Sequence, residues 1–130
     1  RHGEKWMEIK TFFFDTYAFY EIIEGNENYR AYAKNVAIVT TKLNLMELHY
    51  GLLIQYGKKE AERYFDELSK FAIEISDEIM KKANEFRASL KKKNVSYVDC
   101  VGYVIAKSRN IKFLTGDKGF EGLDNVEFVK

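Results

Sequence analysis

The stretch KTFFFDT (residues 10–16) joins three consecutive phenylalanines to a carboxylate. A short and strongly apolar run of this kind is typical of a strand buried in the middle of a sheet. A helical pattern begins near Thr16, so we predict a strand over residues 8–14 that leads directly into a helix. Asp15 would then lie at the carboxyl end of a central strand.

Outward from this stretch, short apolar runs alternate with helical patterns along the chain. Further strands are expected over residues 36–40, 71–75, 111–115 and 126–129, the last of them at a sheet edge. Helices are expected over residues 16–24, 28–34, 41–56, 58–69 and 96–109, and in the segment after Ser76. This alternation predicts an α/β fold with a central, mostly parallel sheet of about four to five strands, flanked by helices on both faces.

The composition is typical of a small soluble domain. The chain has 130 residues, 46% of them hydrophobic, and a formal net charge of +1, so we expect one domain over residues 7–130 and infer no partner from charge alone. Residues 1–6 are expected to be a short arm or the remnant of an added tag. Cys100 is the only cysteine, and every apolar run is shorter than the roughly 20 residues of a membrane helix. We therefore expect a cytoplasmic protein.

Four acidic residues lie where a predicted strand ends or a predicted helix begins: Asp15, Glu47, Asp99 and Asp117. Two of them have an ordinary local explanation in a cap or a turn. Asp15 fits the N-cap of the helix that follows it. Asp117 lies in TGDKG (residues 115–119), which has the composition of a turn.

The other two acids fit a capping box, in which a helix-starting residue and an acid three positions later bond each other's backbone. Asn44 precedes Glu47 by three positions, and Ser96 precedes Asp99 by the same interval. Asp99 would lie in the first turn of its helix, the end that favours negative charge, so capping and metal binding are compatible there. Because each of the four acids has such an alternative, a functional assignment depends on their joint pattern.

Glu47 is the acid that a local explanation fits least well. At about 100° per residue it falls on the same side of its helix as Leu43, Tyr50 and Ile54, which is an apolar side. We therefore expect Glu47 to turn inward, with space left beside it by Gly51. A buried carboxylate without a partner costs several kcal/mol, so Glu47 needs a partner.

Four carboxylates gathered at one place repel one another, and a divalent cation removes that repulsion. Oxygen ligands alone favour Mg²⁺ or Mn²⁺ over zinc. In an open parallel sheet the ligand crevice lies outside the carboxyl ends of the strands, which is where Asp15 and Asp117 are expected. His49 is expected at the surface and Cys100 in the packing, so neither is needed as a ligand.

Four motifs, in this order, resemble those of the PIN-domain family: FFFDT (residues 12–16), NLMELHYG (44–51), SYVDC (96–100) and TGDKGF (115–120). The chain is most similar to the VapC-type ribonuclease toxins, over essentially residues 7–130. The resemblance implies a PIN-like three-layer sandwich and an endoribonuclease that depends on Mg²⁺ or Mn²⁺. It also implies in-line attack by water activated at the metal, with no protein nucleophile.

The resemblance also implies a role for each acid. Asp15, Glu47 and Asp99 would be the main metal ligands, and Asp117 a supporting or second-metal carboxylate. Thr115, and with it Thr16, would orient a carboxylate or a water. The family often has a further acid just after the last aspartate, where this chain has Lys118-Gly119, so a second metal site stays open.

The partners implied by the resemblance are an RNA substrate, a small antitoxin protein that covers the acidic pocket, and a second copy in a homodimer. Basic residues offer phosphate contacts from two sides: Lys81, Lys82, Arg87 and the run 91–93 on one, and Lys107, Arg109, Lys112 and Lys118 on the other. A run such as residues 91–93 more often complements a helix C-terminus and stays solvated. Tyr17, Phe19 and Tyr20 could stack bases or line a partner groove, although core packing or a dimer face is the commoner role of such aromatic residues.

Two alternatives to a toxin remain open at this stage. One is a non-catalytic PIN-like module that binds RNA or protein, and the other is a PIN nuclease of RNA processing without an antitoxin. An aspartyl phosphatase is disfavoured because Tyr17 stands where a second aspartate would be needed. The glycines form neither a phosphate-binding loop nor a dinucleotide fingerprint.

Overall fold

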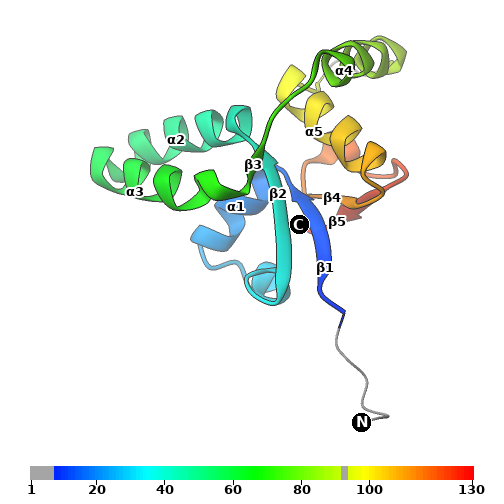
Figure 1. The fold of residues 1–130 in the computed structure, drawn as a ribbon. Helices are drawn as coiled ribbons and strands as arrows, with labels where there is room; N and C mark the ends of the chain where they lie inside the picture. Colours follow the sequence, from blue (N-terminus) through cyan, green and yellow to red (C-terminus); the bar gives the residue numbers. More distant parts are fainter. Residues whose placement is uncertain (1–7, 92–93) are drawn as a thin grey trace, which may run out of the picture.

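A five-stranded parallel sheet in the order β3-β2-β1-β4-β5 forms the centre of the fold (Figure 1). The computed structural model describes residues 8–91 and 94–130, so the expected arm at residues 1–6 lies outside the described residues. The strands are β1 (Lys10–Phe14), β2 (Val36–Thr41), β3 (Ala72–Ile73), β4 (Lys112–Thr115) and β5 (Val126–Phe128). The α-helices are α1 (Thr16–Ile23), α2 (Lys42–Tyr56), α3 (Lys58–Leu68), α4 (Asp77–Ser89) and α5 (Tyr97–Ser108). The 3₁₀-helices are η1 (Glu27–Tyr32), η2 (Ser69–Phe71) and η3 (Lys118–Phe120).

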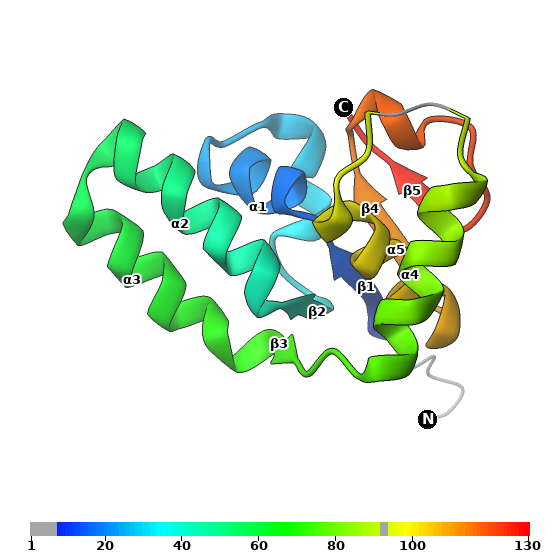
Figure 2. The same ribbon diagram turned by 90° about the horizontal axis from the view of Figure 1, so that it is seen from above.

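Strand β1 is buried on both faces because its side chains alternate between two cores. Phe12 and Phe14 belong to a core that α1, α2 and α3 cover. Phe13 belongs to the opposite core, which is built mainly from α4 and α5. Seen from above (Figure 2), α1, α2 and α3 lie on one side of the strands and α4 and α5 on the other. The predicted three-layer α/β fold with a flanked parallel sheet is thereby confirmed.

Two elements differ from their predicted form. The strand expected over residues 71–75 has only two residues, because Ser69–Phe71 continues α3 as a 3₁₀-helix and β3 pairs only with the last two residues of β2. The helix expected over residues 28–34 is the 3₁₀-helix η1. The final strand lies at a sheet edge, as predicted.

Helix α2 faces the core with a different side from the one predicted. Its buried residues are Asn44, Leu45, Leu48 and Leu52, whereas Tyr50 is 67% and Ile54 70% exposed. Apolar residues surround almost the whole circumference of this helix, so their periodicity does not select a face. The side that carries Ile54 and Tyr50 is therefore an exposed apolar surface.

Two smaller expectations concern Cys100 and the membrane. Cys100 is fully buried, and burial raises the pKa of its thiol to about 11, consistent with a packing role. Within residues 8–91 and 94–130, no helix combines the length and the apolar character needed to cross a bilayer.

Candidate active site

Asp15 occupies the end of the central strand, at the carboxyl edge of the sheet. It is 2% exposed and caps α1: its Oδ1 accepts a hydrogen bond from the Thr16 backbone N–H at 2.8 Å. Its Oδ2 accepts a hydrogen bond from the hydroxyl of Thr115, the last residue of β4, at 2.7 Å. The first residue of α1 and the last residue of β4 thus hold the two oxygens of this carboxyl group.

Asp117 follows the end of β4 and begins η3. Its Oδ1 accepts from the Gly119 backbone N–H at 3.0 Å, which is the turn role predicted from the sequence. Its own backbone N–H donates to the Thr115 hydroxyl oxygen at 3.1 Å. Thr115 therefore links the Asp117 backbone to the Asp15 carboxyl group, which makes it a structural centre of the site.

Glu47 reaches the same place from α2 and finds its partner far away in the sequence. The Thr16 hydroxyl donates to Glu47 Oε1 at 2.7 Å. The capping box considered for Asn44 and Glu47 is not formed, because α2 begins earlier, with Thr41 as its N-cap. Glu47 is half-buried and, unlike the other three acids, has no capping role.

Asp99 forms the capping box predicted for α5. The Ser96 hydroxyl accepts from the Asp99 backbone N–H at 3.1 Å, and Asp99 Oδ2 accepts from the Ser96 backbone N–H at 3.1 Å. Its half-buried carboxylate lies in the first turn of α5, where the helix dipole favours negative charge.

The four acids act on one another electrostatically. Burial, together with the charges of Asp99 and Glu47, raises the pKa of Asp15 to about 8, against the lowering effect of the hydrogen bonds from Thr115 and Thr16. Burial likewise raises the pKa of Asp99 to about 6, helped by the charges of Asp117 and Glu47. Among the described residues, no ion pair joins a lysine or arginine to any of the four. The fold gathers the four predicted acids and leaves their charge unbalanced.

The donor set fits a hard divalent cation, because it consists of carboxylates whose mutual repulsion a cation would relieve. Within the described part of the chain, no three His, Cys, Asp or Glu side chains are at present arranged to hold a metal ion. Each acid is instead turned toward an N–H or O–H group of the protein. Cation binding would therefore require the carboxylates to draw together.

A shallow pocket adjoins the acids on the α2 side. It is lined by Thr16, Tyr20, Met46, Glu47 and Tyr50. The space predicted beside Gly51 is filled by Tyr20, because a Cβ added at Gly51 would lie 1.1 Å from the Tyr20 Oη. The position of Tyr20 near Asp15 indicates stacking or packing, whereas nothing in the sequence indicates that Tyr20 contacts Gly51.

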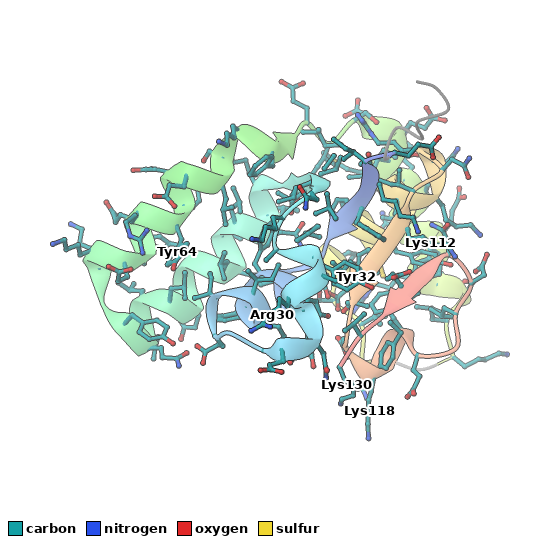
Figure 3. All side chains as sticks on the ribbon, turned by 90° about the horizontal axis from the view of Figure 1, so that it is seen from below. Arg30, Tyr32, Tyr64, Lys112, Lys118 and Lys130 are labelled. Atoms are coloured by element: carbon teal, nitrogen blue, oxygen red, sulfur yellow. The ribbon has the colours of Figure 1, made fainter. Side chains whose placement is uncertain are left out.

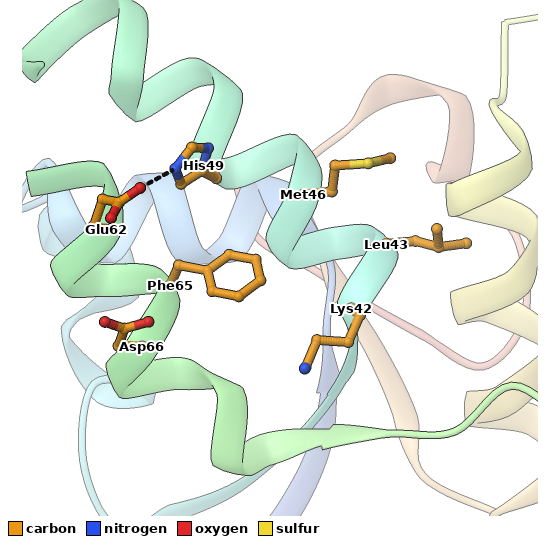
Figure 4. Close-up of a pocket in the computed structure, with 7 residues that line it drawn as sticks. All are labelled: Lys42, Leu43, Met46, His49, Glu62, Phe65 and Asp66. Atoms are coloured by element: carbon orange, nitrogen blue, oxygen red, sulfur yellow. Dashed lines mark ion pairs between the residues drawn. The ribbon is translucent and has the colours of Figure 1, made fainter. Parts of the chain in front are cut away.

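His49 lies in a different groove, between α2 and α3 (Figure 4). Its Nε2 is 3.6 Å from Glu62 Oε2, and its ring meets Phe65 edge-on with a centroid distance of 5.8 Å. The groove contains none of the four acids. His49 is half-buried rather than fully at the surface, and it stands outside the candidate active site, as expected.

Two of the basic residues expected around the site, Lys107 and Lys112, lie elsewhere. Lys107 lies eight residues after Asp99 on α5, about 12 Å along the helix, and pairs with Asp124 at 3.0 Å. Lys112 begins β4, so it lies at the end of the strand opposite Thr115. Figure 3 shows Lys112 and Lys118 well apart. Of these three lysines, only Lys118, which follows Asp117, lies beside the acids. Lys92 and Lys93 lie outside the described residues.

A parallel α/β sheet with four acids at its carboxyl edge defines the class of fold and site. The sequence profile of the PIN domain matches residues 12–126, and the chain belongs to the PIN-domain family. Comparison with curated protein sequences gives no significant match.

Several solved structures share the fold. VapC20 of Mycobacterium tuberculosis, described as a sarcin-ricin loop cleaving toxin, has a TM-score of 0.73 at 18% identity, covering 92% of this chain and 99% of that one. The DNA-bound VapBC of Salmonella typhimurium gives a TM-score of 0.70 at 20% identity, covering 93% and 97%. A toxin–antitoxin complex from Klebsiella pneumoniae gives 0.69 at 19% identity, covering 88% and 93%. The structural similarity to VapC toxins expected from the motifs is confirmed.

Proposed function

We propose that this protein is a metal-dependent endoribonuclease that hydrolyses RNA phosphodiesters and acts as the toxin of a type II toxin–antitoxin pair. The proposal is supported mainly by the electrostatic effect of four acids from separate elements on one another, without a basic partner among the described residues. Membership of the PIN-domain family and the similarity to VapC structures support the reaction class.

The residues have distinct proposed roles. Asp15, Glu47 and Asp99 would hold Mg²⁺ or Mn²⁺, and Asp117 would support them. The metal would lower the pKa of water and neutralise charge on the phosphate. Thr115 holds Asp15 Oδ2 through its hydroxyl, and the Thr16 backbone N–H holds Oδ1, so the central ligand has a fixed orientation. Hydrogen bonds that orient ligands in this way commonly tune metal sites.

The deciding experiment is cleavage of RNA by purified protein with Mn²⁺ or Mg²⁺, with a chelator, and with Asp15→Asn and Asp99→Asn. Asp99→Asn keeps an oxygen acceptor for the Ser96 N–H. Asp15→Asn keeps one for the Thr16 N–H, whereas its amide nitrogen would face the Thr115 hydroxyl and reverse the direction of that hydrogen bond. We expect each to reduce the cleavage rate at least about 100-fold, because a ligand charge is lost. Asp66→Asn is the matched control, since Asp66 is exposed on α3 and separate from the four acids.

Two results would contradict the proposal. If RNA cleavage survives both substitutions, the assignment of these acids to the active site is wrong. Absence of cleavage by folded, metal-loaded protein on any RNA tested would favour the non-catalytic binding module. A nuclease of RNA processing differs from a toxin in lacking an adjacent small reading frame that encodes a DNA-binding antitoxin.

The exposed apolar side of α2 supports the proposed protein partner. Met46, Tyr50 and Ile54 expose large apolar side chains along this helix, and Glu47 lies among them. Contiguous apolar surface of this kind marks interaction sites. We propose that a segment of an antitoxin covers this surface together with the acidic pocket, and that the toxin itself is a homodimer, which light scattering of the purified protein would test.

The antitoxin proposal predicts that Ile54→Asp weakens the complex with the co-purified antitoxin, because a charge would be buried against the partner. We expect a loss of at least about 10-fold in affinity, measured by calorimetry. RNA cleavage by the isolated toxin should stay unchanged, because Ile54 lies outside the acidic site. Equal affinities for Ile54→Asp and the control Gln55→Asp would show that the partner does not cover this side of α2.

A further inference from the structure

Asn44 is a polar side chain with no exposed surface, in the first turn of α2. Buried polar groups are retained where they have hydrogen-bond partners. Asn44 Oδ1 accepts from the Thr41 hydroxyl at 2.6 Å, and Asn44 Nδ2 donates to the Thr16 hydroxyl oxygen at 3.1 Å. The amide therefore connects the start of α2 to the start of α1.

This connection continues to the candidate active site. Thr16 donates its only hydroxyl hydrogen to Glu47 Oε1 at 2.7 Å, a charge-assisted bond, and the alternative acceptor, the Asn44 carbonyl oxygen, is farther away at 3.4 Å. Because Asn44 Nδ2 occupies the acceptor side of the Thr16 oxygen, the hydroxyl hydrogen is free to point at Glu47. The bonds form a directed series from Thr41 through Asn44 and Thr16 to Glu47.

The amide orientation follows from the other bonds of the series. With the Asn44 oxygen and nitrogen exchanged, Oδ1 would face Thr16 and require the hydrogen that Thr16 gives to Glu47. Thr41 Oγ1 already accepts the Asn44 backbone N–H at 3.2 Å and keeps its own hydrogen for Oδ1. The orientation with Nδ2 at Thr16 therefore satisfies every member of the series.

We propose that Asn44 is a positioning residue that orients the Glu47 carboxylate through the Thr16 hydroxyl. The proposal rests on the function proposed above, in which Glu47 is a metal ligand. A glutamate on the exposed side of a helix has several rotamers available. Thr16 holds two acids at once, Asp15 by its backbone N–H and Glu47 by its hydroxyl, and Asn44 sets the direction of that hydroxyl.

The test is the affinity for Mn²⁺ alone, measured by calorimetry at a temperature where circular dichroism shows every variant folded. Asn44→Ala and Thr16→Val are each expected to weaken Mn²⁺ binding about 10- to 100-fold, the usual effect of removing a group that orients a ligand. Because the two residues act in series, the double variant should bind no more weakly than Thr16→Val. Independent, additive losses would overturn the proposal.

Thr41 and Thr40 supply a matched pair that does not depend on the folding of an Asn44 variant. Both threonines are fully buried, and valine has the same shape. The Thr41 hydroxyl belongs to the series, whereas the Thr40 hydroxyl donates to the Phe14 carbonyl oxygen at 3.1 Å and stands outside it. We expect Thr41→Val to weaken Mn²⁺ binding and Thr40→Val to leave it unchanged. Equal affinities in the two variants would overturn the proposal.

Glu47→Gln separates a failure of this inference from a failure of the proposed function. If Glu47→Gln weakens Mn²⁺ binding and Thr41→Val does not, Glu47 is a ligand that needs no positioning by Asn44. If Glu47→Gln leaves Mn²⁺ binding unchanged, the metal site itself is wrong, and the positioning role falls with it. If Glu47→Gln and Thr41→Val both weaken Mn²⁺ binding and Thr40→Val does not, the result supports the metal site and the positioning role of Asn44.

Discussion

At the scale of single residues, Asp15 is the most constrained of the four acids. Its carboxyl group is buried, two hydrogen bonds hold it, and it meets the charges of Asp99 and Glu47. A carboxylate in this position costs free energy as soon as it ionises, because burial removes hydration and the neighbours repel it. The free energy of unfolding of the metal-free protein should therefore decrease when Asp15 ionises.

This cost predicts a pH-dependent difference between the wild-type protein and Asp15→Asn. The pKa of Asp15 is about 8 in the folded protein, above its ordinary value of 3.8, so the folded state binds more protons between these values. Relative to Asp15→Asn, the wild type should lose stability as pH rises from about 4 to about 8, by on the order of a few kcal/mol. Urea unfolding in the presence of a chelator measures the difference. A pH-independent difference would contradict the burial argument.

Local sequence patterns predict the structural role of three of the four acids. Asp15, Asp99 and Asp117 cap or turn the chain within three residues of their own positions. The partner of Glu47 is the Thr16 hydroxyl, 31 residues earlier, and no spacing rule reaches that distance. The same limit hides the contact of Tyr20 with Gly51, since both depend on how α1 lies across α2.

At the scale of elements, α5 approaches the sheet closely at Gly102. A Cβ added there would lie 2.5 Å from Cε1 of Phe13 and 3.0 Å from Cε1 of Phe113. These rings stack with centroids 5.7 Å apart and are fully buried. The approach brings the first turn of α5, with Asp99, to the carboxyl edge of the sheet. Gly102 thus belongs to the packing that places a candidate ligand.

We predict that Gly102→Ala destabilises the protein by about 1–3 kcal/mol, because the new methyl group overpacks a closed core. Gly51→Ala makes the same chemical change on α2 but meets the far end of the Tyr20 side chain, which can swing away. Its cost should be much smaller, since only the end of one side chain has to move, while the helix propensity that alanine gains over glycine, about 1 kcal/mol, is common to both variants. Chemical denaturation compares the two; equal losses of stability would place α5 farther from the sheet than described.

Element types are more predictable than the faces the elements present. The strands and helices follow from short apolar runs, caps and glycines, and residues 10–16 alone predict the central strand and the helix after it. For α2, apolar residues lie on nearly all sides, so only packing against α1 and α3 selects Leu45, Leu48 and Leu52 as the buried side. Ile54 and Tyr50 are exposed for the same reason.

At the scale of the whole molecule, the sheet order brings together acids that belong to both cores. Asp15 ends the central strand, Glu47 belongs to the helical layer on one face, and Asp99 to the layer on the other. Alternating strands and helices predict a parallel sheet, whose carboxyl ends share one edge. They do not predict the order β3-β2-β1-β4-β5, which depends on long-range pairing.

A cation bound between these acids would therefore join the two helical layers. We predict that Mn²⁺ stabilises the protein, by about 2.7 kcal/mol at a free concentration 100 times its dissociation constant. Amide hydrogen exchange should slow around Glu47 in α2 and around Asp99 in α5, because the two residues would share one ion. Asp15→Asn should lose both effects, since Asp15 lies between the layers, whereas Asp66→Asn should keep them. Protection confined to α5 would show that Asp99 binds the ion without Glu47, and the site would then belong to one layer only.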